Sequence, residues 1–118
     1  LDTVLATSDV VSIHLLLNDD TRGMIGRDKI AKMKKGVILI NTARGAIVDE
    51  SAMIDALKSG HIRHAGLDVF NIEPLPADHP VTKLPNVTLS AHSAFRTPEA
   101  SENLIEAAWQ HCRRIVKE

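Results

Sequence analysis

Four short apolar runs, separated by segments with helical or turn character, constrain the fold of this chain more than any other feature. The run at 37–40, VILI, is apolar at every position and does not alternate with polar residues. Strands that are buried on both faces of a parallel sheet have this pattern. We therefore expect strands at residues 10–17, 37–40, 65–70 and 87–90.

Helices are expected around these strands. Residues 27–36 place Ile30 and Met33 one turn apart and reach Gly36, a residue that suits the C-terminal end of a helix. Residues 1–9 read as the end of a further helix. Strands that alternate with helices build right-handed βαβ units, so the pattern predicts an α/β fold with a parallel sheet.

Two further helices and one loop complete the predicted order. Residues 49–60 begin with Asp49 as an N-cap. The segment from Thr97 to Glu118 has Thr97 in a capping position and a stripe of apolar residues at helical spacing, made up of Leu104, Ala108, Cys112 and Ile115. Residues 71–86 contain four of the five prolines and are expected to form an irregular loop.

Composition limits the class of partner. The chain has 118 residues, which suits one domain, and its formal net charge is −1 with scattered Lys and Arg, so we expect no nucleic-acid partner. No apolar run approaches the roughly 18–20 residues of a membrane span, so no membrane partner is expected. The single cysteine, Cys112, suits a reducing compartment, and a cytoplasmic location is the default expectation. Because the chain begins at Leu1, we expect it to be part of a longer protein.

Polar residues follow the predicted strands at the place where parallel sheets bind ligands, beyond the carboxyl ends of the strands. Arg44 follows the second strand, Asp68 and Glu73 come within and after the third, and His92 follows the fourth. Because the carboxyl ends of parallel strands share one edge, we expect these four side chains to lie close together. A guanidinium matches a carboxylate bidentately, and a histidine paired with a carboxylate is a general acid–base. The set predicts proton transfer on a small acid.

Each of these residues also has a structural interpretation. Arg44 could form a surface salt bridge with an acid at the start of the following helix, and Asp68 could be a hydrogen-bonded residue that turns the chain after its strand. Glu73 could be an ordinary loop acid, and His92 a histidine at the rim with no chemical role. The spacings typical of metal sites, such as HxxxH or paired cysteines, do not occur, so no metal site is expected.

Three motifs in order, NTARG at 41–45, LDVFNIEP at 67–74 and AHSAFRTPEA at 91–100, resemble the cofactor-binding domain of the D-2-hydroxyacid dehydrogenases. The opening segment SDVVSIHLLL and the later TRGMIG extend the resemblance over essentially the whole chain. The resemblance implies the second half of a Rossmann-type, doubly wound parallel sheet with three α/β/α layers. It also implies NAD or NADP as cofactor and a homodimer formed through the cofactor domain.

The resemblance also implies roles for individual residues. Arg44 matches the arginine that grips the carboxylate and carbonyl of a 2-oxo acid, His92 matches the acid–base, and Glu73 matches its carboxylate partner. Asp68 matches the acid that contacts the nicotinamide carboxamide. The implied cofactor contacts are His14, as a pocket wall, with Thr42, Ala43, Arg44, Asp68 and His92.

The chain departs from the family pattern in several ways. Ala91 stands where a proline commonly precedes the histidine, and Phe95 and Arg96 bring a bulky and a charged side chain near the site, where we expect them to affect substrate choice. The glycine-rich phosphate loop GxGxxG, the ribose-binding acid and the substrate domain do not occur in these residues. We therefore expect residues 1–118 to be the C-terminal portion of the NAD(P)-binding domain, inactive alone.

The expected function is hydride transfer between a nicotinamide cofactor and a 2-hydroxy or 2-oxo acid. Glu73 favours this chemistry over that of formate dehydrogenases, where a glutamine typically partners the histidine because formate oxidation needs no proton acceptor. An alternative is an NAD-sensing corepressor or scaffold, because such proteins resemble the same family and retain much of its catalytic set.

Overall fold

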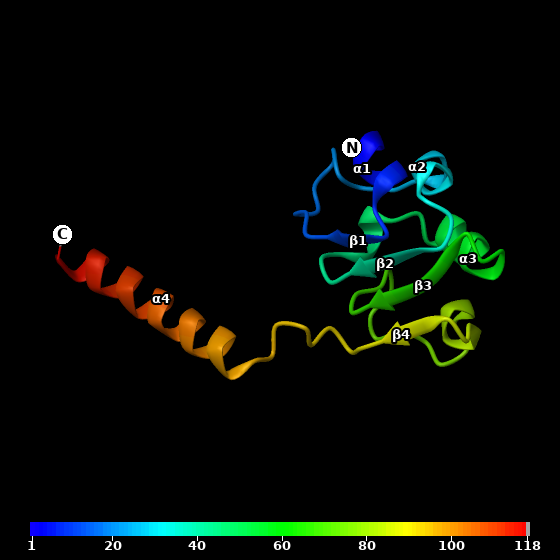
Figure 1. Ribbon diagram of the computed structural model, residues 1–118. Helices are drawn as coiled ribbons and strands as arrows, with labels where there is room; N and C mark the ends of the chain where they lie inside the picture. The colour runs from blue at the N-terminus through cyan, green and yellow to red at the C-terminus, as the bar shows by residue number, and fades with distance from the viewer. Residues whose placement is uncertain (118) are drawn as a thin grey trace.

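The computed structural model describes residues 1–117 and contains a four-stranded sheet in which every pair of neighbouring strands is parallel (Figure 1). The strands are β1 (Val10–Ile13), β2 (Val37–Asn41), β3 (Ile62–Leu67) and β4 (Val87–Leu89). Their order across the sheet is the same as their order along the chain. The helices are α1 (Asp2–Thr7), α2 (Arg27–Lys32), α3 (Glu50–Lys58) and α4 (Pro98–Lys117), with short 3₁₀ helices η1 (Gly45–Ile47) and η2 (Pro80–Lys83). The predicted α/β fold with a parallel sheet is confirmed.

The hydrophobic core lies between one face of the sheet and helices α2 and α3. Helix α2 connects β1 to β2, and α3 connects β2 to β3, so both crossover connections run in the same direction across the sheet. Because such connections are right-handed, the two helices lie on the same face, where they contact each other. Val37 and Leu39 of β2 are buried in this core, whereas the alternate residues Ile38 and Ile40 are half-buried. The expectation that this strand is buried on both faces is therefore not met, because α2 and α3 cover only one of them.

All four strands differ from their predicted bounds, β2 and β4 by a single residue at the carboxyl end and β1 and β3 by more. Strand β1 stops at Ile13 rather than residue 17, because Ile13 is in register with Asn41, the last residue of the neighbouring strand. Strand β3 begins at Ile62, before the predicted residue 65, and ends at Leu67. Asp68 is consequently the first residue beyond β3 and not a residue within it.

Two helix predictions have different outcomes. The helix expected at 27–36 ends at Lys32, because the next residue, Met33, already has an extended backbone with ψ 151°. Gly36 adopts a φ of +85° in the turn that enters β2, a conformation that glycine tolerates best. The predicted N-cap Asp49 is confirmed, since its carboxylate accepts a hydrogen bond of 3.0 Å from the N–H of Ala52.

Helix α4 confirms the predicted last helix and extends away from the sheet (Figure 1). The hydroxyl of Thr97 accepts a hydrogen bond of 3.1 Å from the N–H of Ala100, as expected of a cap. Glu118, the predicted last residue of the helix, lies outside the described residues. None of the helices within residues 1–117 combines the length and apolar character needed to cross a membrane. The four apolar residues of the stripe predicted for α4 are all exposed: Leu104, Ala108, Cys112 and Ile115.

Candidate active site

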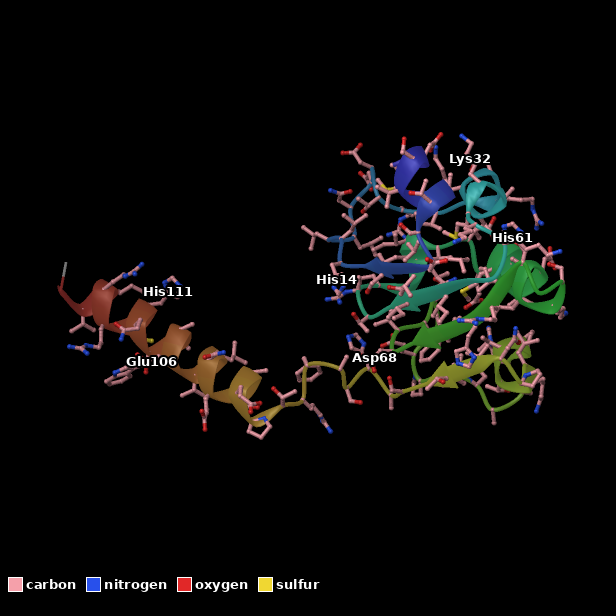
Figure 2. All side chains as sticks on the ribbon, in the orientation of Figure 1. His14, Lys32, His61, Asp68, Glu106 and His111 are labelled. Carbon is pink, nitrogen blue, oxygen red and sulfur yellow. The ribbon has the colours of Figure 1, made fainter. Side chains whose placement is uncertain are left out.

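The carboxyl ends of the four parallel strands form one edge of the sheet, and the predicted site residues lie along it. Arg44 comes three residues after β2, Asp68 directly after β3 and His92 three residues after β4. Figure 2 shows His14 and Asp68 at this edge. Because β1 and β4 are the two outer strands, His14 lies at the opposite end of the edge from His92.

His92 and Glu73 form a hydrogen-bonded pair at the β4 end of this edge. The Nδ1 atom of His92 lies 2.7 Å from Oε2 of Glu73, and the two side chains are 40% and 34% exposed. The hydrogen bond from His92 and a second one, from the N–H of Phe70, lower the pKa of Glu73 below its ordinary value, and the charge of Arg44 contributes. Because an ionised carboxylate can only accept, Nδ1 carries a hydrogen. Within residues 1–117, Nε2 of His92 has no hydrogen-bond partner.

Arg44 is exposed and holds no carboxylate among the described residues. Its guanidinium donates one hydrogen bond of 2.6 Å, to the carbonyl of the preceding residue, Ala43. The surface salt bridge considered as an alternative is thus not formed within residues 1–117. Its charge nevertheless lies near enough to Glu73 to lower the pKa of that carboxyl group. A guanidinium in this position remains free for an anionic ligand.

Two residues that the sequence analysis did not assign to the site support the turn that carries Arg44. The side chain of Asn41, 2% exposed, donates to the carbonyl of Arg44 and accepts from the N–H of Ala43, each at 3.0 Å. Gly45 lies against the backbone of Phe70 without room for a side chain. The sequence signal that could have identified Asn41 is an amide at the end of an apolar strand, directly before a short turn.

Asp68 is 3% exposed, and its carboxylate faces the segment that carries His92. It accepts hydrogen bonds from Ser90, Ser93 and Ala94. Asp68 is therefore a hydrogen-bonded residue at the end of a strand, as its structural interpretation expected. Its predicted contact with the nicotinamide remains a prediction.

The remaining predicted cofactor contacts differ in their surroundings. Thr42 is exposed, and Ala43 is half-buried against the core. His14 is exposed just beyond β1, and its Nε2 lies 2.8 Å from the hydroxyl oxygen of Ser12. The expectation that His14 lies inside the first strand is wrong, because β1 ends one residue earlier. All three cofactor roles stay predictions.

A hollow of about 590 Å³ opens beside the His92–Glu73 pair. Apart from the pair itself and Ser90, its lining is apolar and consists of Phe70, Pro74, Leu75, Leu89 and Ala91. Farther along the chain, the guanidinium carbon of Arg96 lies 6.0 Å from the centre of the Phe95 ring, and Phe95 is largely exposed. Among residues 1–117, no three His, Cys, Asp or Glu side chains group in a way that could hold a metal ion.

The sequence of this chain matches a family model. The model for the D-isomer specific 2-hydroxyacid dehydrogenase, NAD binding domain, matches residues 1–94, a span that includes Arg44, Glu73 and His92. The chain belongs to this family. The resemblance inferred from the three motifs is thereby confirmed.

The chain is also similar to individual members of the family. The chain is 48% identical to a glyoxylate reductase of Thermofilum pendens over 117 residues, 99% of this chain and 34% of that protein. A family structure from Lactobacillus delbrueckii ssp. bulgaricus, in an NAD complexed form, is 38% identical with a TM-score of 0.86, covering 99% of this chain and 40% of that one.

A second family structure, from Xanthobacter autotrophicus Py2, was solved in complex with NADPH and MES. It is 44% identical with a TM-score of 0.76, covering 78% of this chain and 30% of that one. The family structures thus include complexes with either nicotinamide cofactor. The chain spans about a third of the length of the curated relatives it matches.

Proposed function

We propose that this chain is the C-terminal portion, residues 1–118, of the NAD(P)-binding domain of an oxidoreductase that transfers hydride between NAD(H) or NADP(H) and a 2-hydroxy or 2-oxo acid. The observation that carries the proposal is the 2.7 Å contact between His92 and Glu73 beside a guanidinium that lacks a carboxylate partner within residues 1–117. An acid–base pair next to a free cation suits an anionic substrate that gains or loses a proton.

The nicotinamide end of a dinucleotide fits the edge on which this pair lies. The exposed Thr42 and half-buried Ala43 follow β2 at the carboxyl edge of a parallel sheet, where nucleotides bind in folds of this type. We propose that Thr42, Ala43 and Asp68 contact the nicotinamide and that His14 lines the adenosine side. When bound, the cofactor supplies or accepts the hydride at C2 of the acid.

The residues of the chain perform the rest of the reaction. In the reducing direction Arg44 binds the carboxylate of the oxo acid and polarises its carbonyl, which holds C2 ready for hydride addition. The Nε2–H of His92 gives its proton to the carbonyl oxygen, and the imidazole that results regains a proton from water. Glu73 holds the Nδ1–H and stabilises the cationic ring before the transfer. In the oxidising direction His92 accepts the hydroxyl proton.

The apolar hollow beside the pair supports a small organic acid as substrate, since Phe70, Leu75 and Leu89 offer contacts to carbon rather than to charge. Glu73 supports hydroxy-acid chemistry over formate oxidation, because a carboxylate stabilises the proton-carrying histidine. The corepressor alternative receives no support from the geometry, and the relatives described above are named as enzymes or as members of an enzyme family.

The assembly and location are part of the same proposal. We propose a homodimer formed through the cofactor domain. We also propose a cytoplasmic location, which the single exposed cysteine supports because a free cysteine suits a reducing compartment. The isolated chain is expected to be inactive, because it contains no glycine-rich loop for the pyrophosphate.

The deciding experiment measures oxidation of NADH and NADPH by the full-length parent protein with glyoxylate, hydroxypyruvate, pyruvate and bulkier 2-oxo acids. Arg44→Ala is expected to abolish most turnover, whereas Arg63→Ala, an exposed arginine near the amino end of β3, is the matched control and is expected to retain it. Tight cofactor binding without turnover of any acid would overturn the proposal.

A further inference from the structure

The carboxylate of Asp68 is enclosed by the segment that carries His92. Its Oδ1 accepts hydrogen bonds from the hydroxyl of Ser90 at 2.5 Å and from the N–H of Ser93 at 2.9 Å. Its Oδ2 accepts from the N–H of Ala94, also at 2.9 Å. The backbone carbonyl of the same aspartate accepts from the N–H of His92 at 2.9 Å. Asp68 therefore bonds to residues on both sides of His92 and to His92 itself.

This enclosure coincides with an unusual backbone. His92 has a φ of +49°, the left-handed region that residues with a β-carbon rarely adopt, and it is the one non-glycine residue with positive φ within residues 1–117. Such a conformation persists only where the surroundings impose it. The four hydrogen bonds to Asp68 hold His92 itself and residues on both sides of it, so they supply that constraint.

The charge of Asp68 strengthens the arrangement. Burial by itself raises the pKa of this carboxyl group, but the hydrogen bonds from Ser90, Ala94 and Ser93 outweigh burial and bring the pKa below its ordinary value. Asp68 is therefore an anion at neutral pH, and hydrogen bonds from backbone N–H groups to an anion are stronger than those to a neutral acceptor. An amide in the same place would offer one acceptor oxygen to three donors.

We propose that Asp68 is the positioning residue of His92: its carboxylate holds residues 90–94 so that His92 keeps its left-handed backbone and its Nδ1 stays on Glu73. The proposal rests on the acid–base role proposed for His92. It gives Asp68 a role in addition to the proposed nicotinamide contact, since its three hydrogen bonds leave part of the acceptor capacity of the two oxygens free. A shift of the imidazole of about 1 Å is enough to cost on the order of 100-fold in rate.

The experiment uses the full-length parent protein with Asp68→Asn and Ser90→Ala. The matched controls are Asp49→Asn and Ser51→Ala, because Asp49 also accepts from a serine hydroxyl, at 2.7 Å, and from a backbone N–H, but at the start of α3. Three quantities are measured: kcat with its pH profile, the dissociation constant of NADH, and the downfield NMR signal of the Nδ1 proton shared by His92 and Glu73.

Ser90→Ala is expected to lower kcat by about 10-fold, the equivalent of one hydrogen bond to a charged group, and Asp68→Asn is expected to lower it further. In Ser90→Ala, NADH binding should stay within about 2-fold, because the carboxylate proposed to contact the nicotinamide remains in place. The Nδ1 proton signal should weaken, and the acidic limb of the kcat profile should move to higher pH as Glu73 loses its partner. Ser90→Thr, which restores the hydroxyl, should restore kcat, and the two controls should match the parent.

An unchanged Nδ1 signal and an unchanged pH profile in both variants, with NADH binding weakened in Asp68→Asn, would overturn the proposal and leave Asp68 as a cofactor contact alone. If Asp68→Asn does not fold, Ser90→Ala decides, since it leaves the carboxylate in place. If the parent turns over no oxo acid, the proposed function fails, but loss of the Nδ1 signal in Ser90→Ala still supports the positioning role and its retention still contradicts it.

Discussion

A β-carbon placed on Gly45 would lie 2.3 Å from the carbonyl carbon of Phe70, so the turn after β2 and the turn after β3 touch backbone to backbone. This contact joins the segment that carries Arg44 to the segment that carries Glu73. Only glycine permits the approach, because any side chain at position 45 would force the two turns apart. The glycine beside Arg44 thus sets the spacing between the proposed substrate-binding guanidinium and the carboxylate of Glu73.

Gly45→Ala is expected to destabilise the parent protein by roughly 1–3 kcal/mol, the usual cost of overpacking, and to lower kcat/KM for the oxo acid as Arg44 moves away from Glu73. Denaturant unfolding and steady-state kinetics measure the two effects. Gly66→Ala is the control, because a β-carbon there would meet Ile40 at 3.9 Å, an ordinary contact. Equal effects of the two substitutions would contradict this account of the contact.

Asn41→Ala should leave the N–H of Ala43 and the carbonyl of Arg44 without partners in a buried turn. We expect a loss of about 1–3 kcal/mol in unfolding free energy together with a higher KM for the oxo acid. Asn86→Ala is the matched control, since Asn86 donates to the backbone carbonyls of Leu57 and Arg63, away from the edge of the site. It should lower stability while leaving KM unchanged, and a raised KM in the control would count against the assignment.

Glu73→Gln should lower kcat for oxo-acid reduction by roughly 100-fold, because a neutral amide cannot stabilise the protonated ring of His92. Stopped-flow or steady-state oxidation of NADH measures the change. Glu50→Gln removes a similar acid, whose Oε2 lies 3.2 Å from Nε2 of His79, and provides the control. Near-normal kcat in Glu73→Gln would show that the pair does not transfer the proton.

The lowered pKa of Glu73 predicts a pH dependence of stability. Its ordinary value is 4.5, and the native state holds it lower through His92 and Phe70, so the ionised form is favoured by folding. The stabilisation is therefore complete above the ordinary value and is lost as the pH falls through the lowered native value. The difference in unfolding free energy between the parent and Glu73→Gln should shrink as the pH falls below about 4.5. A difference that stays constant on acidification would contradict the lowered pKa.

Much of the site could be predicted because its chemistry follows local order in the sequence. Arg44, Glu73 and His92 each come shortly after an apolar strand, and parallel strands must bring such positions to one edge. The supports of the site could not be predicted in this way. Gly45 meets Phe70, and Asp68 meets Ser90, across 22 residues of sequence or more, and no local pattern encodes such a contact.

The sequence by itself determined the α/β class, the parallel sheet, the caps at Asp49 and Thr97, and the chemical groups at the carboxyl edge, since hydrophobic spacing and capping act over a few residues. Only the tertiary structure decided where each element ends and what each polar group holds. Strand β1 stops at Ile13 because its neighbour stops at Asn41, and the carboxylate of Asp68 bonds to the loop of His92 because two turns from different strands meet there. Strand ends and buried hydrogen bonds depend on partners that are distant in the chain, and folding alone brings those partners together.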